Sequence, residues 1–199
     1  MNQDGAVNIE DLVLVARQYK QTGENSADIN GDGVVNIEDL VLVAAALDNA
    51  AAAPASNPQV FEMLTVADIE GWLLQAQGLA LTDAMSQRGI IFLEHLLAAL
   101  TPKETALLSN YPNPFNPETW IPYHLAHAAD VTVTIYDTGG MPMRRLDLGH
   151  QSAGYYTARS KAAYWDGRNE RGESVASGVY FYQLRAGDYT ALRRMVIVK

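Results

Sequence analysis

The chain has 199 residues, no cysteine and a formal net charge of −9. One or two domains are expected, and disulfide frameworks and thiol chemistry are excluded. Residues 1–50 carry nine acidic and two basic side chains, whereas residues 111–199 carry eight and ten. No basic stripe with interleaved aromatic residues argues for nucleic-acid binding, and without a run of about 18 apolar residues we expect no membrane span.

The stretch "DINGDGVVNIED" (residues 28–39) has the spacing of an EF-hand-type calcium loop. Oxygen-bearing side chains alternate at its start, and Gly33 stands sixth, where such a loop turns sharply. Calcium binds six to eight oxygens, and a carboxylate at the twelfth position closes the shell. The alternative is an Asx-rich turn followed by a helix N-cap. The predicted ligands are Asp28, Asn30, Asp32, the Val34 carbonyl, Asn36 and Asp39.

The opening stretch of the chain repeats this loop at a shift of 28 residues. The sequence "VNIEDLVLVA" occurs identically at 7–16 and at 35–44. The first-position carboxylate of the opening loop has no counterpart, because it would precede Met1. We therefore expect one or two calcium ions, and a chain that is the tail of a longer protein or has a misplaced start. The predicted ligands of this loop are Asn2, Asp4, the Ala6 carbonyl, Asn8 and Asp11.

A helix is predicted after each loop. Asn8 and Asn36 are good N-cap residues, and an aspartate follows each of them three residues later. No helical pattern precedes the second loop, where "QTGENSA" indicates a linker. Helical spacing is shown by Ile9, Leu12, Val13, Ala16 and Tyr19.

Two copies of a loop followed by one helix, with Asp at the twelfth position, resemble dockerin modules over residues 1–48. The resemblance implies a small extracellular adaptor that folds with calcium and binds a cohesin-like or other protein partner. The positions that set partner choice in cellulosomal dockerins often carry a hydroxyl pair. Here they are Ile9–Glu10 and Ile37–Glu38, which argues against a cellulosomal cohesin and leaves calcium binding unaffected.

Two further helices are predicted after an Ala-, Pro- and Asn-rich linker. Thr65 caps the first, with Asp68 three residues on, and this helix runs to about Gln77. Thr82 caps the second, which ends before Pro102. The two form a helical hairpin that buries its apolar face against itself or against the helices that follow the loops.

The remainder of the chain predicts a β-sandwich of the immunoglobulin or fibronectin type. The prolines of "NYPNPFNPETW" favour an extended lead into the first strand. The segment "VTVTIYD" alternates apolar and polar residues, "GG" at 139–140 marks a turn, and about seven short strands follow at regular spacing. Trp165 is expected in the core and Asp166–Gly167 in a turn. Gly172 and Gly178 are expected to allow tight bends.

The stretches "NYPNPFNPET", "IYDTGG", "YWDGRNERGESVASGVYFYQL" and "MVIVK" resemble one set of sandwiches. These are the C-terminal sorting domains of type IX secretion substrates and the related Ig-like domain of the flagellar hook-capping protein. The resemblance covers Asn110 to Lys199. It implies a domain that an outer-membrane secretion machinery reads, in a secreted or cell-surface protein of a two-membrane bacterium. The last strand is the best candidate for the contact.

The sequence thus predicts a multi-domain α + β chain without catalytic function, whose catalytic domain, if any, lies upstream. No G-x-S-x-G, H-E-x-x-H or Gly-rich phosphate loop is present, and the acids cluster in the calcium loops. The pairs Glu94–His95 and His124–His127 are expected to be surface residues. The predicted parts are the dockerin-like domain (1–48), a linker (49–60), the helical hairpin (61–101), a second linker (102–110) and the sandwich (111–199).

The alternative function is an accessory carbohydrate-binding part of a polysaccharide-degrading hydrolase. Dockerins accompany such enzymes, which are active in polysaccharide catabolism. Aromatic side chains that alternate along strands are usually core residues, but they can also stack on sugar rings. The candidates for stacking are Trp120, Tyr123, Tyr155, Tyr156, Trp165, Tyr180 and Tyr182.

Overall fold

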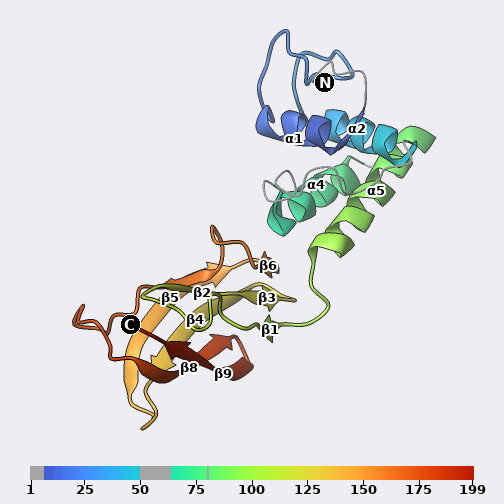
Figure 1. The fold of residues 1–199 in the computed structure, drawn as a ribbon. Coiled ribbons are helices and arrows are strands. Elements are labelled where there is room, and N and C mark those ends of the chain that lie inside the picture. The colour runs from blue at the N-terminus through green and yellow to red at the C-terminus, as the bar shows by residue number, and fades with distance from the viewer. Residues whose placement is uncertain (1–6, 50–63, 80) are drawn as a thin grey trace. The chain divides into compact units, whose positions relative to one another are not determined.

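The structure, a computed structural model, describes residues 7–49, 64–79 and 81–199. The chain forms two compact units, Met1–Leu100 and Thr101–Lys199. The first is helical and the second is built of strands, which confirms the expected α + β class (Figure 1). None of the helices in the described ranges is both long and apolar enough to span a bilayer.

The helical unit contains α1 (Ile9–Arg17), α2 (Ile37–Asn49), α4 (Val66–Gly78) and α5 (Ala84–Leu100). The predicted N-caps of the first three are confirmed, because Asn8, Asn36 and Thr65 each form a capping box with the aspartate three residues later. The predicted cap of α5 is wrong. Asp83, and not Thr82, accepts hydrogen bonds from the backbone N–H groups of Met85 and Ser86, at 3.1 and 2.9 Å.

All four helices share one hydrophobic core. Leu12 of α1, Leu40 of α2, Ile69 of α4 and Leu93 of α5 are fully buried in the same cluster. The closest approach lies between α2 and α5 (Figure 1), where a Cβ added to Gly89 would lie 2.0 Å from the Val41 carbonyl oxygen. Of the two packing arrangements left open by the sequence, the structure therefore has the hairpin packed on α2 as well as on itself.

The sandwich contains nine strands in the described residues, against about seven predicted. Two short strands, β2 and β3, are separated by Pro122, and β1 falls in the expected linker. The orders are β1-β3-β6, β2-β7 and β5-β4-β8-β9, and all pairings are antiparallel. The strands are β1 (Ala106–Leu107), β2 (Thr119–Ile121), β3 (Tyr123–Leu125), β4 (Ala129–Tyr136), β5 (Pro142–Gln151), β6 (Gly154–Tyr156), β7 (Ala163–Trp165), β8 (Gly178–Ala186) and β9 (Tyr189–Ile197).

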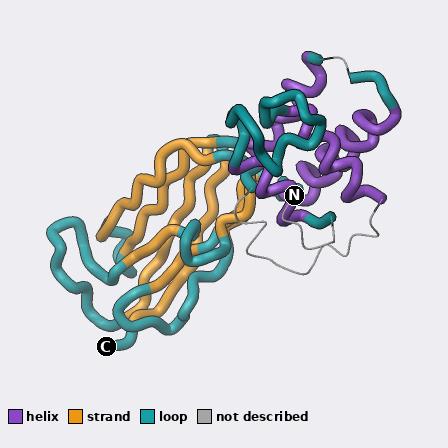
Figure 2. The backbone as a smooth tube through the Cα atoms, turned by 90° about the horizontal axis from the view of Figure 1, so that it is seen from above, coloured by secondary structure: helices purple, strands orange, loops and turns teal. Residues whose placement is uncertain are grey.

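Side chains from all three sheets meet in a second hydrophobic core (Figure 2). Alternation along β4 buries Val131, Val133 and Ile135, as predicted. Trp165 is also buried as predicted, and its ring lies 5.5 Å from Phe115 and 5.9 Å from Tyr180. Burial of this large ring is a major stabilising contribution to the sandwich.

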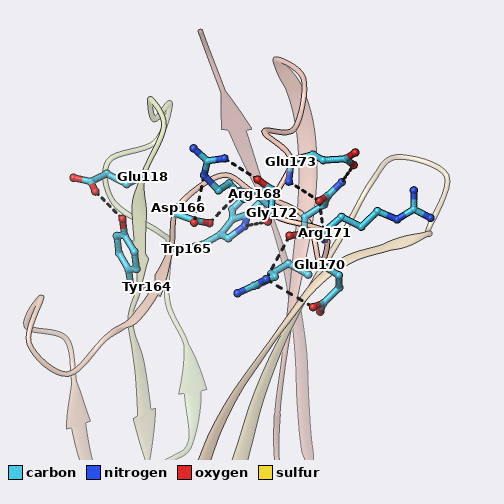
Figure 3. A network of polar contacts seen from close by, with 11 residues as sticks. Glu118, Tyr164, Trp165, Asp166, Arg168, Glu170, Arg171, Gly172 and Glu173 are labelled. Carbon is cyan, nitrogen blue, oxygen red and sulfur yellow. Dashed lines mark hydrogen bonds and ion pairs between the residues drawn. The ribbon is translucent and has the colours of Figure 1, made fainter.

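The turn after β7 is held by a network of polar contacts (Figure 3). The Trp165 indole N–H donates to the Arg168 carbonyl (2.8 Å), and the Arg168 guanidinium donates to the Gly172 carbonyl (2.7 Å). Gly167 has φ +70°, and a Cβ there would lie 2.5 Å from the Pro117 carbonyl oxygen. The turn predicted at Asp166–Gly167 is confirmed, and Gly167 is required there by both its φ and its surroundings.

The segment that leads into the sandwich is fastened to the last two strands. The Tyr182 hydroxyl donates to the Leu108 carbonyl (2.8 Å) and accepts from the Asn110 N–H (3.0 Å). The Phe115 N–H donates to the Val196 carbonyl, and the Val198 N–H donates to the Phe115 carbonyl, both at 3.0 Å. Residues 108–115 therefore pack against the β8–β9 hairpin.

Candidate functional site

The loop at residues 28–39 is organised around its first carboxylate. Asp28 accepts hydrogen bonds from the N–H groups of Gly31 (2.7 Å), Asp32 (3.2 Å) and Gly33 (2.8 Å). Gly31 and Gly33 have φ of +75° and +87°, a region that glycine enters at little cost. The two glycines thus allow the backbone to wrap around the Asp28 carboxylate, as a calcium loop requires.

Three predicted ligands meet at the Asp32 side chain. The amide groups of Asn30 and Asn36 donate to the same oxygen, Oδ2, at 3.1 and 3.0 Å. Hydrogen bonds from the Val34 N–H and from the two amides lower the pKa of the Asp32 carboxyl group. An Asn amide carries an acceptor oxygen beside its donor nitrogen, so the same side chains are able to present oxygen to a cation.

The closing carboxylate, Asp39, is fully buried and joins the two ends of the loop. Its Oδ1 accepts from the N–H groups of Ile29 (2.6 Å) and Asn30 (3.1 Å), and its Oδ2 accepts from the Asn36 N–H (2.8 Å). Asp39 is therefore directed at backbone groups of the loop, and it caps α2 at the same time. In this geometry it is a loop anchor rather than part of the cluster around Asp32.

The donor set of this loop fits calcium in its chemistry. Every predicted ligand atom is an oxygen, which hard cations prefer. Among the described residues, none donates a hydrogen bond to the Val34 carbonyl, and no basic side chain forms an ion pair with Asp28, Asp32 or Asp39. Within the same residues, no three His, Cys, Asp or Glu side chains are grouped closely enough to hold a metal alone. Amide and carbonyl oxygens would have to complete the shell.

The described part of the first loop has the same geometry as the second. Asp11 is fully buried and accepts the Asn8 N–H at 3.0 Å, and Asn8 accepts the Glu10 N–H at 2.7 Å. The corresponding distances at Asn36 and Asp39 are 2.8 and 2.7 Å. The other predicted ligands of this loop, Asn2, Asp4 and Ala6, lie outside the described residues.

One contact in the second loop was not predicted. The Asn30 amide also donates to the Glu38 carboxylate, at 3.2 Å. The sequence analysis gave Glu38 a place only among the positions that set partner choice. The available signal was a second carboxylate directly before the closing aspartate.

The histidines expected at the surface do not form a joint site. Glu94 and His95 are exposed on α5, and His127 is exposed after β3. His124 is half-buried, with its ring 4.7 Å from Tyr155. Burial lowers the pKa of His124, and the negative charge of Glu104 partly opposes that shift.

Four of the seven aromatic side chains considered for sugar stacking are core residues. Tyr123, Trp165, Tyr180 and Tyr182 are buried, so their rings are not available to a sugar. Trp120 remains partly exposed, but its ring is flanked by Tyr111 and Tyr164, and the Arg159 guanidinium lies 4.2 Å from its centroid. The structure therefore gives the carbohydrate-binding alternative little surface.

Two segments of the chain match known families. Residues 1–48 match the family model of the dockerin type I domain, and residues 117–190 match that of the FlgD Ig-like domain. The two suspected families are thereby confirmed in these segments. Both are non-catalytic domain types, and dockerin type I domains normally bind calcium and a cohesin-type protein. A comparison with curated proteins gave no match.

Solved structures give remote likenesses. PorZ, a surface component of the type IX secretion system of Porphyromonas gingivalis, is 23% identical over 47% of this chain and 12% of its own, with a TM-score of 0.34. PorU from the same organism is 18% identical over 50% and 10%, with a TM-score of 0.38. FlgD from P. aeruginosa is 20% identical over 49% and 75%, with a TM-score of 0.34. This chain spans 12% or less of PorZ and PorU, and no functional assignment rests on these scores.

Proposed function

We propose that the chain is a non-catalytic module of a secreted or surface protein, with two tasks. Its dockerin-like repeats bind calcium and a protein partner, and its Ig-like sandwich serves as a sorting signal. The observation that carries the first task is the loop at residues 28–39, where three backbone N–H groups surround Asp28 and the Val34 carbonyl stays available. The dockerin match over residues 1–48 supports it.

In this proposal the second loop binds one ion through Asp28, Asn30, Asp32, the Val34 carbonyl, Asn36 and Asp39. The ion neutralises carboxylates that have no basic partner among the described residues. The first loop binds a second ion through Asn2, Asp4, the Ala6 carbonyl, Asn8 and Asp11. The protein partner is of the cohesin type, and it meets Ile–Glu pairs in place of the hydroxyl pairs of cellulosomal dockerins.

Calcium titration by calorimetry, with thermal melts in calcium and in EDTA, tests the first task. Extracellular sites of this type have Kd values of about 10⁻⁴–10⁻³ M. Calcium at a hundredfold excess over Kd should stabilise the helical unit by about 2.7 kcal/mol per site. Asp28→Ala should abolish binding at the second loop.

The matched control is Asp68→Ala, which removes a carboxylate from the same unit. Asp68 belongs to the capping box of α4 and lies outside both loops. Asp68→Ala should lower stability equally in calcium and in EDTA. An unchanged calcium response in Asp28→Ala would refute the ligand assignment, whereas heat from one site rather than two would limit binding to one loop.

The sorting role rests on the motifs between Asn110 and Lys199 and on the FlgD Ig-like match over residues 117–190. We place the recognised surface on the last strand, β9. Deleting the chain from Leu192 onward should block surface delivery of a fused reporter in a host with type IX secretion. That deletion also removes Met195 and Ile197 from the core, so it alone would not separate recognition from folding.

A folded variant makes the export test specific. Leu192 and Arg194 are exposed, and Leu192→Asp with Arg194→Glu alters the surface of β9 while leaving its core residues in place. The matched control, Arg145→Glu, alters an exposed residue of β5. We expect delivery to fall in the β9 variant and to persist in the control. Undiminished delivery of the β9 variant would refute recognition through this strand.

A further inference from the structure

The two edges of the four-stranded sheet differ in how they are covered. At the β5 edge, the Arg145 N–H donates to the Glu170 carboxylate (2.7 Å), and the Met143 carbonyl accepts the Glu170 N–H (2.9 Å). The pairing of β5 with β4 is also interrupted by two register shifts. Side-chain cover and bulges are devices that prevent an edge from pairing with another strand.

The β9 edge lacks these devices along most of its length. Its pairing with β8 runs without a register shift from Tyr189 to Ile197. The segment around Phe115 covers only the last part, through its hydrogen bonds with Val196 and Val198, and Asn113 accepts the Val196 N–H (3.0 Å). A regular, uncovered edge can accept a further strand.

The position of the Phe115 contacts shows which backbone groups face outward. Val196 and Val198 bond away from β8, and outward groups recur at every second residue of a regular strand. Thr190, Leu192 and Arg194 therefore also present their N–H and C=O groups to the open edge. Among the described residues, no donor or acceptor pairs with those groups.

The side chains beside this edge are apolar and basic. Leu192 is 58% exposed and Val179 is 40% exposed. The solvent-facing positions of the β8–β9 hairpin carry two arginines and no acidic residue: Val179, Phe181, Gln183 and Arg185 on β8, and Thr190, Leu192, Arg194 and Val196 on β9. An incoming strand with alternating acidic and apolar residues complements this pattern in charge and in hydrophobicity.

We propose that the β9 edge between Thr190 and Arg194 binds an extended segment of a partner protein, which adds a fifth strand through backbone hydrogen bonds and places acidic side chains near Arg194 and Arg185. Two copies of this chain are a poorer match, because both edges carry arginine and like charges on adjacent strands repel. The proposal concerns the surface itself, and it holds whether or not the sandwich is a sorting signal.

The test is a selection of random nine-residue peptides on the full chain, counter-selected on Leu192→Pro. Proline removes the outward N–H at an edge position, where it is tolerated, and Leu192 makes no backbone hydrogen bond to β8. A thermal melt verifies that the variant is folded. Leu192→Ala, which keeps the N–H, is the matched side-chain control.

The expected peptides alternate acidic and apolar residues. Their affinity, measured by fluorescence anisotropy, should fall about tenfold or more in Leu192→Pro, and less in Leu192→Ala. It should also fall in Arg194→Glu, and for peptides with lysine in place of the acids. Equal binding by a folded Leu192→Pro variant would overturn the proposal, as would failure of the chain to retain any peptide. Self-association that Leu192→Pro abolishes would reassign the edge to a second copy of the chain.

Discussion

Replacing Gly89 of α5 by alanine tests how tightly the helical hairpin is bound to α2. In an exposed helix, this substitution stabilises by about 1 kcal/mol, because glycine is a poor helix former. Here the new Cβ would lie 2.0 Å from the Val41 carbonyl oxygen and 2.9 Å from a Val41 methyl carbon. Carbon and carbonyl oxygen normally approach to about 3.3 Å, so α5 must retreat from α2 by roughly 1 Å.

The two effects have opposite signs, and their magnitudes decide the outcome. Overpacking in a well-packed core costs about 1–3 kcal/mol, and a backbone neighbour cannot move aside as a side chain can. We therefore expect a net loss of about 1–2 kcal/mol in the free energy of unfolding. For a unit of this size, that loss lowers the Tm by roughly 5–15 °C.

Far-UV circular dichroism follows the melting of the helical unit. Gly71→Ala in α4 is the matched control, because no atom lies within 4 Å of the added Cβ. That variant should gain up to about 1 kcal/mol. If Gly89→Ala instead raised the Tm in the way expected of Gly71→Ala, the close contact between α5 and α2 would be refuted.

Three further predictions concern a cap, a turn and a titration. Asp83→Ala should destabilise the helical unit by about 1 kcal/mol in thermal melts, whereas Thr82→Ala should be nearly neutral; equal effects would contradict the Asp83 cap. Gly167→Ala should destabilise the sandwich more than Gly172→Ala, because both have positive φ but only Gly167 has a carbonyl within 3 Å of the added Cβ. Burial lowers the pKa of His124 below the unfolded value of about 6.5. Stability of the sandwich should therefore fall as the pH drops through that value, and His124→Phe should flatten the slope of Tm against pH.

Local signals in the sequence predicted the beginnings of helices well. The identical segments at 7–16 and 35–44 gave both loop helices and their caps, because capping depends on residues within one turn of each other. The same locality explains the error at Thr82. Two adjacent residues were both good caps, and only the hydrogen bonds of Asp83 distinguish them.

Long-range packing could not be predicted from the same signals. Gly89 in the middle of α5 has no local reason, and its role depends on the carbonyl of Val41 in another helix. In the sandwich, the alternation along β4 predicted its buried face, but a proline-split strand and a two-residue strand have too few residues to show a period.

The calcium loop shows a similar division. Spacing alone brought Asp28, Asn30, Asp32 and Asn36 to one loop, because these residues are close in the chain. It did not predict that Asp39 would bond to the backbone at Ile29, since that contact depends on how the loop closes. The contact of Glu38 with Asn30 was missed for the same reason.

The fastening of the segment before β2 affects what a protease could do to this domain. Asn113, Pro114 and Asn116 are exposed, and exposed loops are where proteases cut. On one side of such a cut, Leu108 and Asn110 remain bonded to the Tyr182 hydroxyl, and Arg193 still donates to Leu107. The two fragments would therefore stay together under native conditions and separate only on denaturation. A nicked chain would run as one species in gel filtration and as two bands on a denaturing gel.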